Sequence, residues 1–238
     1  MQVRRARGIE GARGARGTVV VIDVLRAFTT AACAFAAGTE RIELVATPEE
    51  ALALKAKEPE LVLVGEVGGR PIAGFDHGNS PERMLALDLR GQTVILRSSS
   101  GVQGALVAAR TGRSLFLGSF VTAAATVRAI RARSEDVTLL AMGASGTERG
   151  LDGPEDDVCA ELLAARLAGE AFEWGPAEAR VRGSPSAHAA LDPSVDWISP
   201  GDLACALALD RFDFAIEARV QGERLVAFTS SPSDRRRS

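Results

Sequence analysis

The residues of this sequence that are best placed to do chemistry follow runs of apolar residues. Asp23 closes the run TVVVID at 18–23, and Arg26 comes three residues later. A carboxylate at the end of an apolar strand requires a cation or hydrogen-bond donors. Two interpretations stay open: Asp23 and Arg26 pair and cap the following helix, or Asp23 binds a metal ion while Arg26 binds an anion such as phosphate.

A second polar group consists of Ser98, Ser99, Ser100 and Gly101, which follow the apolar run at 92–96. Hydroxyls and backbone N–H groups at the start of a helix bind anions, and glycine permits the tight turn that this requires. A nucleotide-binding Walker loop is excluded because the pattern GxxxxGK[ST] is absent. The group predicts either an anion site or a serine-rich helix cap.

The long glycine-rich loop at 65–80 is the most unusual stretch of the chain. Glu66 opens it, and its second part places Asp76, Asn79 and Ser80 among two glycines. Loops of about 16 residues inside a domain are uncommon and usually functional. Ser80 is followed by a proline, which is typical of a helix start, and that interpretation leaves Asp76 and Asn79 as ligand candidates.

Three consecutive acids, Glu155, Asp156 and Asp157, follow Pro154 at the start of another predicted helix. Acids in the first turn stabilise any helix through its dipole, so capping alone is one interpretation. Three carboxylates exceed what capping needs, and oxygen-rich sites suit Mg²⁺, which takes one or two carboxylates and keeps several waters. The run therefore favours a magnesium site.

Other reactive residue types form no competing motif. His77 and His188 lack the HxH or HExxH spacing of a zinc site, and neither GxSxG nor a GxGxxG after the first strand is present. Cys33, Cys159 and Cys205 form no CxxC pair, and we expect them in the core. Their odd number argues against a disulfide framework and is typical of a reducing cytoplasm.

The elements that must position these groups alternate along the chain. Short β-branched runs separated by helical stretches predict βαβ units, and therefore a three-layer α/β/α fold with a largely parallel sheet. Ligands bind such sheets outside the carboxyl ends of the strands, which is where the polar groups lie. Strands are expected at 18–23, 41–45, 61–64, 92–96, 115–117 and 137–141, helices at 27–37, 121–133 and 202–209 and from 48, 101 and 154, a C-terminal β-hairpin at 214–220 and 224–229, and an irregular stretch at 170–199.

Residues 18–230 are predicted to form one α/β domain, with two lobes meeting at a cleft as the alternative. Residues 1–17 carry five arginines and four glycines, which predict a flexible leader, with binding of an acidic partner as the alternative. The leader lacks the apolar stretch of a secretory signal. Residues 231–238 predict a flexible tail.

The composition excludes several classes of protein. Of the 238 residues, 46% are hydrophobic and 25% are charged, which is typical of a soluble globular protein. The longest apolar run spans about seven residues, whereas a membrane helix needs about 20. The net charge of −3 argues against a dedicated nucleic-acid binder. We therefore expect a cytoplasmic protein whose partner is a small molecule, not a membrane or a nucleic acid.

Together these motifs resemble those of the 2-phosphosulfolactate phosphatase family. The similarity extends from about residue 18 to residue 167 and comprises VIDVLRA at 21–27 (family pattern V-I-D-x-L-R-A), Gly65 and Glu66 (G-E-R), GFDHGNSP at 74–81 (G-F-D-x-x-N-S-P), SSSG at 98–101 (the T-T-x-N-G loop), and Gly143, Gly146, Glu155 and Asp156 (a glycine-rich turn and an acidic pair).

The resemblance implies a Mg²⁺-dependent phosphatase that hydrolyses a small anionic phosphoester, such as 2-phosphosulfolactate, to sulfolactate and phosphate on the route to coenzyme M. It implies that the metal neutralises phosphoryl oxygens and positions a water. A homodimer is in keeping with an enzyme of this size. The implied residues are Asp23, Arg26 and Asp76 for catalysis, Asp23, Glu66, Glu155 and Asp156 for the metal, and Arg26, Asn79, Ser80, Ser99, Ser100 and Gly101 for the substrate.

Two departures from the family pattern bear on the substrate. Val67 stands where the family has an arginine, and Ser100 stands where it has an asparagine, with Val-Gln at 102–103 in place of Thr-Arg. A site with fewer positive groups suits a substrate with phosphate, sulfonate and carboxylate less well. The departures therefore favour another small phosphorylated acid, or the alternative of a phosphoester-binding protein without turnover.

Overall fold

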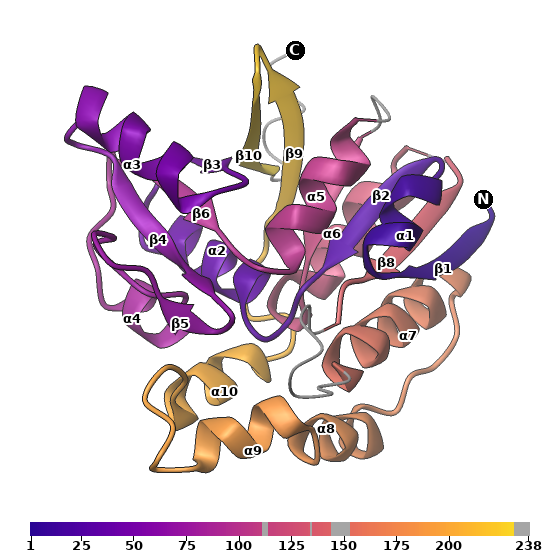
Figure 1. The fold of residues 1–238 in the computed structure, drawn as a ribbon. Coiled ribbons are helices and arrows are strands. Elements are labelled where there is room, and N and C mark those ends of the chain that lie inside the picture. Colours follow the sequence, from indigo (N-terminus) through magenta and orange to yellow (C-terminus); the bar gives the residue numbers. More distant parts are fainter. Residues whose placement is uncertain (111–113, 134, 144–152, 231–238) are drawn as a thin grey trace.

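The computed structural model describes residues 1–110, 114–133, 135–143 and 153–230. These residues form one ten-stranded sheet with helices on both faces, which confirms the predicted α/β fold (Figure 1). The strands are β1 (Val3–Arg7), β2 (Thr18–Ile22), β3 (Arg41–Leu44), β4 (Val62–Val67), β5 (Arg70–Pro71), β6 (Thr93–Arg97), β7 (Leu115–Gly118), β8 (Val137–Ala141), β9 (Ala215–Gln221) and β10 (Arg224–Ser230). The helices are α1 (Gly8–Gly14), α2 (Ala27–Ala36), α3 (Pro48–Lys57), α4 (Pro81–Leu85), α5 (Gly101–Ala109), the 3₁₀ turn η1 (Phe120–Thr122), α6 (Ala123–Arg131), α7 (Pro154–Ala168), α8 (Trp174–Arg182), α9 (Pro185–Leu191) and α10 (Pro200–Ala206).

The sheet consists of two parallel halves with an antiparallel hairpin between them. One half has the order β1-β8-β2-β7, and the other has the order β3-β6-β4 with the short β5 paired antiparallel to β4. The hairpin β9-β10 joins β7 to β3. The C-terminal hairpin predicted from the sequence is therefore confirmed, and it lies at the centre of the sheet.

Twist brings the ends of the two halves together. The hairpin reverses the strand direction between the halves, so β2 and β4 would end at opposite edges of a flat sheet. Six strand-to-strand steps separate β2 from β4, and at about 20–25° per step the accumulated rotation is on the order of 120–150°. Figure 1 shows the result, with both strands running toward the same lower region of the molecule. The residues that follow these strands can therefore share one site.

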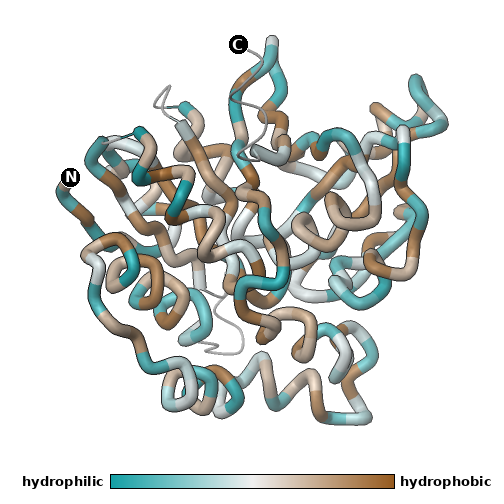
Figure 2. The backbone as a smooth tube through the Cα atoms, turned by 180° about the vertical axis from the view of Figure 1, so that it is seen from behind, coloured by the Kyte–Doolittle hydropathy of each residue, from teal (hydrophilic) through white to brown (hydrophobic). Residues whose placement is uncertain are grey.

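The apolar residues of β2 point alternately into two cores, one on each face of the sheet. Val19 and Val21 pack in the core that contains α2 and α5, whereas Val20 and Ile22 pack in the core that contains α6 and α7. A strand buried on both faces has apolar side chains on both, which is why residues 19–22 form a continuous apolar run. Figure 2 shows hydrophobic positions on the inner strands and hydrophilic ones at the outer turns.

The stretch at 170–199, expected to be irregular, contains two helices, and that prediction is wrong. Each buries a narrow apolar stripe: α8 buries Ala177 and Val181, and α9 buries Ala187 and Ala190. Two small residues a turn apart give little periodicity, so packing against the rest of the domain fixes these helices. Among the described helices, these included, none has the length and apolar character to cross a membrane.

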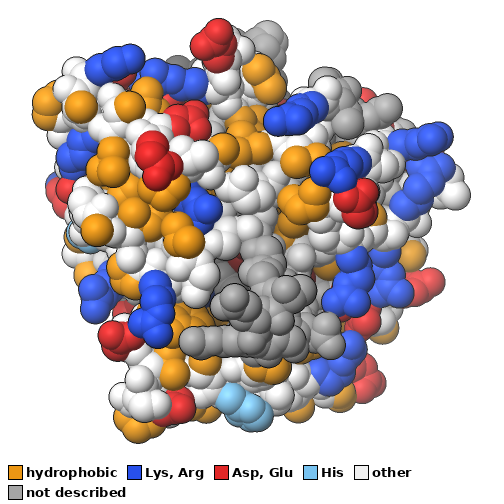
Figure 3. All heavy atoms as spheres, viewed as in Figure 1, with side chains coloured by type: hydrophobic (Ala, Val, Ile, Leu, Met, Phe, Trp, Pro, Cys, Tyr) orange, Lys and Arg blue, Asp and Glu red, His pale blue; other side chains and the backbone are white. Residues whose placement is uncertain are grey.

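The N-terminal segment belongs to the sheet, so the prediction of a flexible leader at 1–17 is wrong. Val3–Arg7 pairs in parallel with Val137–Ala141, and Ala12 of α1 is completely buried. Arg4, Arg5, Arg7 and Arg13 remain outside and pair with acids, as Arg7 does with Asp157 at 2.8 Å. Figure 3 shows these basic and acidic side chains next to one another over β1 and α7. The predicted tail at 231–238 lies outside the described residues.

Removing residues 1–14 should lower the free energy of unfolding by on the order of 3–5 kcal/mol, because the ladder between β1 and β8 and the burial of α1 are lost. Urea unfolding followed by circular dichroism measures this. The control is Arg4→Ala, which removes an exposed ion pair with Asp136 and an exposed bond to Gln2 and should cost at most about 1 kcal/mol. An unchanged urea midpoint in the truncated protein would restore the leader interpretation.

Candidate active site

Asp23 joins the end of β2 to the starts of two helices. Its side chain follows the buried strand, and the residue is only 6% exposed. Oδ1 accepts the backbone N–H of Ala27 at 3.0 Å, and Oδ2 accepts that of Gly101 at 2.8 Å. A Cβ at Gly101 would lie 2.5 Å from Oδ2, so only glycine allows this approach. Asp23 therefore binds the first residue of α2, as the capping interpretation predicted, and also fixes the start of α5. The ion pair between Asp23 and Arg26 that the same interpretation included is not found among the described residues, where Arg26 pairs with Asp202.

Glu66 ties the turn after β4 to the serine loop. Its carboxylate accepts the backbone N–H of Ser99 and, at 2.6 Å, that of Gly69. The Ser99 hydroxyl donates to the same carboxylate at 3.1 Å. Both oxygens are thus engaged by protein donors, and Glu66 holds two loops in a fixed relation at the carboxyl ends of β4 and β6.

Asp156 and Glu155 begin α7 and differ in what their oxygens contact. The Asp156 oxygens accept the backbone N–H groups of Val24 and Gly143, each at 2.8 Å. Glu155 is 3% exposed, and its Oε2 is buried with no hydrogen-bond partner among the described residues. Asp156 therefore fixes the loops that follow β2 and β8, whereas Glu155 keeps an oxygen for another ligand.

These carboxylates raise one another's affinity for protons. Burial raises the pKa of Asp23 to about 6, and the charge of Glu66 adds to this effect. Burial also raises the pKa of Asp156, and the charges of Asp23 and Glu155 raise it further. Burial, joined by the charge of Asp23, likewise raises the pKa of Glu155. Such mutual repulsion in a buried cluster is relieved by a bound cation.

The cluster fits a cation that needs few protein ligands. Among the described residues, no three Asp, Glu, His or Cys side chains are arranged to hold a metal ion. Mg²⁺ takes one or two carboxylates and retains waters. The unpartnered Oε2 of Glu155 and the neighbouring charge of Asp23 fit such a site, whereas a fully protein-ligated site does not match this geometry.

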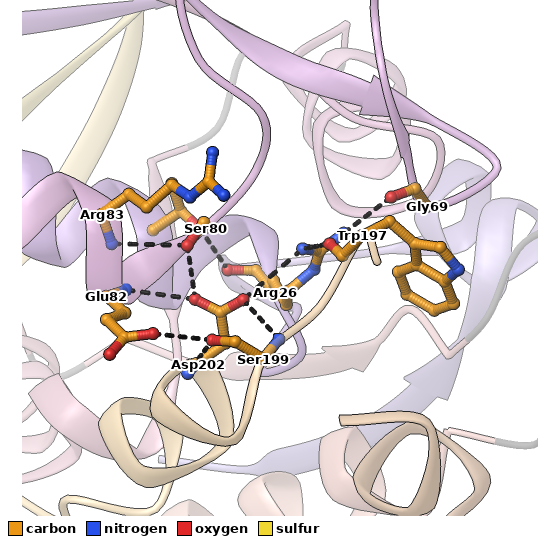
Figure 4. Close-up of polar contacts among 9 residues, drawn as sticks. Arg26, Gly69, Ser80, Glu82, Arg83, Trp197, Ser199 and Asp202 are labelled. Atoms are coloured by element: carbon orange, nitrogen blue, oxygen red, sulfur yellow. Dashed lines mark hydrogen bonds and ion pairs between the residues drawn. The ribbon is translucent and has the colours of Figure 1, made fainter. Parts of the chain in front are cut away.

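Arg26 lies beside the cluster and connects three segments of the chain (Figure 4). Its guanidinium donates to the carbonyl of Gly69 at 2.8 Å and to that of Trp197, whose ring centroid is 5.3 Å from the guanidinium carbon. Burial lowers the pKa of Arg26, and the charges of Asp202, Glu66 and Asp23 oppose that shift. A cation therefore stands within electrostatic reach of Asp23 and Glu66, and anion binding by Arg26 stays a prediction.

The serines after β6 divide between capping and the site. The Ser98 hydroxyl accepts the backbone N–H of Val102 at 3.0 Å, which confirms the helix-cap interpretation for this residue. The Ser100 hydroxyl donates to the carbonyl of Gly143 at 2.7 Å and so joins α5 to the end of β8. Anion binding by Ser99, Ser100 and Gly101 stays a prediction. Residues 145 and 146 of the predicted glycine-rich turn lie outside the described residues.

The loop at 74–81 sends its polar residues in different directions. Asp76 receives a bond from Lys55 and accepts the backbone N–H of Leu63 at 2.8 Å. Burial acts to raise the pKa of Asp76, but these bonds lower it overall. The structure therefore does not bring Asp76 into the carboxylate cluster, because Lys55 of α3 holds it elsewhere.

Ser80 and Asn79 also have separate environments. Ser80 accepts the backbone N–H of Arg83 at 3.3 Å and donates to Asp202, so the predicted helix start at α4 is confirmed. Its hydroxyl is committed to these two bonds. Asn79 is 3% exposed, and its Oδ1 has no hydrogen-bond partner among the described residues. Asn79 thus keeps a polar atom for a ligand, whereas Ser80 does not.

Sequence reasoning missed three residues that support the site. Asp202 and Trp197 contact Arg26 from the C-terminal part of the chain, and Arg97 donates to the Glu66 carbonyl and to the Ser99 hydroxyl at 3.0 Å. Arg97 is the last residue of β6 and directly follows the strand predicted at 92–96. A charged residue at that position, immediately before the serine loop, was the signal in the sequence that could have identified it. Arg97 thus places a guanidinium near Val67, the residue that stands where the family pattern has an arginine and that is itself 48% exposed.

Comparison with known proteins agrees with this geometry. A family profile described as 2-phosphosulpholactate phosphatase matches residues 5–193. The chain is 32% identical over 205 residues to the probable 2-phosphosulfolactate phosphatase of Bacillus subtilis, which covers 86% of this chain and 88% of that protein. It is 39% identical over 135 residues to a protein of the same description from Thermus thermophilus, 56% of each chain. It is 44% identical over 125 residues to another from Carboxydothermus hydrogenoformans, 52% of this chain and 51% of that one.

Proposed function

Because the chain belongs to the 2-phosphosulpholactate phosphatase family, we propose that it is a Mg²⁺-dependent phosphatase that hydrolyses 2-phosphosulfolactate or a closely similar phosphorylated acid. Water and 2-phosphosulfolactate give sulfolactate and phosphate in this reaction. A role in the cytoplasm on the route to coenzyme M belongs to the same proposal. The alternative of a binding protein without turnover gains no support from the comparisons.

The single observation that carries the proposal is the meeting of buried carboxylates with a buried guanidinium at the carboxyl ends of strands from both halves of the sheet. Asp23, Glu155 and Asp156 come from β2 and α7, and Glu66 comes from β4. Arg26 stands within electrostatic reach of Asp23 and Glu66. A divalent cation supplies the positive charge that the four carboxylates lack, and with Arg26 it can hold an anionic phosphoryl group.

We assign the cation to Asp23 and Glu155, since Glu155 keeps an unpartnered buried oxygen. When bound, Mg²⁺ would neutralise phosphoryl oxygens and lower the pKa of a water. The oxygens of Asp23, Glu66 and Asp156 all accept backbone N–H groups already and would bind a cation through their second lone pairs. Asp23 is preferred because its charge acts on both Glu155 and Asp156, and Glu66 and Asp156 remain candidates. Their main contribution in this account is to keep the loops in place.

The phosphoester is held by groups on the other side of the cluster. Arg26 presents N–H donors beyond those that Gly69 and Trp197 accept. Asn79 supplies a buried amide. The loop with Ser99, Ser100 and Gly101 lines the site, and its groups would reach the substrate only by exchanging their present bonds to Glu66, Gly143 and Asp23. Arg97, beside Ser99, adds a second positive charge for the acid groups of the substrate.

The proposal is tested by phosphate release from 2-phosphosulfolactate, phospholactate and p-nitrophenyl phosphate. We expect the sulfonated or carboxylated esters to give kcat/KM at least about tenfold above p-nitrophenyl phosphate, because Arg26 and Arg97 add charge-assisted bonds. Arg97→Gln should reduce this preference. No release from any of the three by the folded protein with Mg²⁺ would contradict the proposed function.

Glu155→Gln should stabilise the metal-free protein and remove its stabilisation by Mg²⁺. The pKa of Glu155 is raised above 4.5 in the folded protein, so the folded state holds the proton more tightly and the wild type loses stability as the pH rises past that value. The gain should be absent near about pH 4 and should appear as the pH is raised to about 8 in EDTA. Thermal and urea unfolding with and without Mg²⁺ measure both effects.

The matched control is Asp157→Asn, two residues along the same acidic run. Asp157 pairs with Arg7 at 2.8 Å and is partly exposed, so this change should alter stability by less than about 1 kcal/mol and leave the Mg²⁺ effect intact. A Glu155→Gln protein that is less stable than wild type in EDTA, or that is still stabilised by Mg²⁺, would argue against Glu155 as a metal ligand.

A further inference from the structure

Asp202 is a buried carboxylate that the proposed chemistry does not use. It lies in the first turn of α10, and its side chain is 2% exposed. Its Oδ1 accepts the Ser80 hydroxyl at 2.6 Å and the backbone N–H of Glu82 at 3.1 Å, and its Oδ2 accepts the backbone N–H of Ser199 at 3.1 Å. Figure 4 shows these bonds converging on one carboxylate from α4 and α10. Its position is therefore fixed from several sides.

The fixed carboxylate faces Arg26. Oδ2 of Asp202 lies 3.7 Å from Nη1 of Arg26, and both side chains are almost completely buried. Nη1 also donates to the carbonyl of Trp197, and Nη2 donates to that of Gly69. A guanidinium has five N–H donors, so these bonds leave others for a ligand. Asp202 and the two carbonyls together define one orientation of the guanidinium plane.

The alternative partners of Arg26 are the carboxylates of the site itself. Asp23 and Glu66 both act on its charge, after Asp202. Without the counter-charge at Asp202, Arg26 would be drawn toward Asp23 and Glu66, where it would compete with the cation and turn its donors away from the substrate. Asp202 thus neutralises the buried charge of Arg26 and also keeps Arg26 from pairing with Asp23 or Glu66.

We propose that Asp202 is a positioning residue that holds the Arg26 guanidinium in the orientation in which it binds a phosphoryl group. This inference rests on the proposed function for the role of Arg26, but phosphate binding tests it without turnover. It also explains why α10, far along the chain from the motifs of the site, is docked against the start of α4.

The test is a double-mutant cycle read by calorimetric binding of inorganic phosphate in the presence of Mg²⁺. Asp202→Asn should weaken phosphate binding by about 10- to 100-fold, the cost expected when a binding group is displaced by about 1 Å. Arg26→Lys should weaken it similarly. The double variant should bind no more weakly than Arg26→Lys alone, because Asp202 acts through Arg26.

Two further variants separate positioning from general stability. Asp210→Asn is the matched control, since Asp210 also holds a backbone N–H (Ala124, 2.7 Å) and an arginine (Arg166, 2.6 Å) but lies outside the Arg26 contacts. It should lower stability and leave phosphate binding unchanged. Ser80→Ala removes one bond from Asp202 without removing its charge, and should weaken phosphate binding by about two- to fivefold. It provides the test should Asp202→Asn fail to fold.

The outcomes distinguish this inference from the proposed function. Unchanged phosphate affinity in both Asp202→Asn and Ser80→Ala would overturn the positioning role. A double variant whose loss of affinity equals the product of the losses in Asp202→Asn and Arg26→Lys would overturn it as well. Phosphate binding that follows the predicted cycle in a protein that hydrolyses no phosphoester would support the positioning role and contradict the phosphatase.

Discussion

Asp23→Asn should lower kcat/KM for 2-phosphosulfolactate by at least about 10³-fold. The asparagine loses the charge that the cation requires. It also cannot accept both the Ala27 and the Gly101 N–H bonds, since one of its two terminal atoms is a donor. Initial rates of phosphate release at saturating Mg²⁺ measure the loss.

The loss must be separated from unfolding, because Asp23 also caps α2 and holds the start of α5. Circular dichroism and the urea midpoint of Asp23→Asn give the folded fraction. A structural role alone would reduce activity only in proportion to that fraction. A folded variant that keeps a tenth or more of wild-type kcat/KM would remove Asp23 from the proposed chemistry.

Arg26→Lys should raise KM by about 10²-fold although the charge is retained. Lysine presents a single ammonium and cannot bridge the carbonyls of Gly69 and Trp197 while facing a phosphoryl group. Arg26→Ala should in addition cost on the order of 3–5 kcal/mol of stability, because Asp202 is then left buried without its counter-charge. Steady-state kinetics and urea unfolding of both variants test this.

The control is Arg166→Lys, which weakens a two-bond ion pair with Asp210 away from the site. It should lower stability with KM unchanged. If Arg26→Lys leaves KM within about twofold of wild type while Arg166→Lys behaves as expected, Arg26 is a structural tie between loops and does not bind substrate.

Local pattern was sufficient for most of the fold. Residues 19–22 had to be apolar because β2 is buried on both faces, and the strand ended where Asp23 began. The helix start at Thr47 is confirmed by its bond from the Glu50 N–H at 3.2 Å. Elements whose stability depends on partners distant in the chain were harder to predict: β1 pairs with residues more than 130 positions away, and its arginine-rich composition resembled a flexible leader.

The site residues show the same contrast between local sequence pattern and contacts made across the chain. Asp23, Glu66, Glu155 and Asp156 were identified because each follows a strand or opens a helix, and the structure brings them together. Asp76 lies further along the loop that Glu66 opens, but Lys55 binds its carboxylate away from the cluster, and spacing alone does not reveal that contact. Asp202 was expected only as the start of a helix at 202–209; the structure shows it in a capping box with Ser199, and its contact with Arg26 arises only when α10 packs against α4.

The most direct test of the central claim is Mg²⁺ dependence of 2-phosphosulfolactate hydrolysis by the wild-type chain. Phosphate release would be followed with millimolar Mg²⁺, then with excess EDTA, then after Mg²⁺ is restored. We expect phosphate release by the wild type to stop in EDTA and to return with Mg²⁺. We expect none from Asp23→Asn under any of these conditions. Hydrolysis that continues unchanged in EDTA would contradict the metal-dependent site, and no release under any condition would contradict the phosphatase itself.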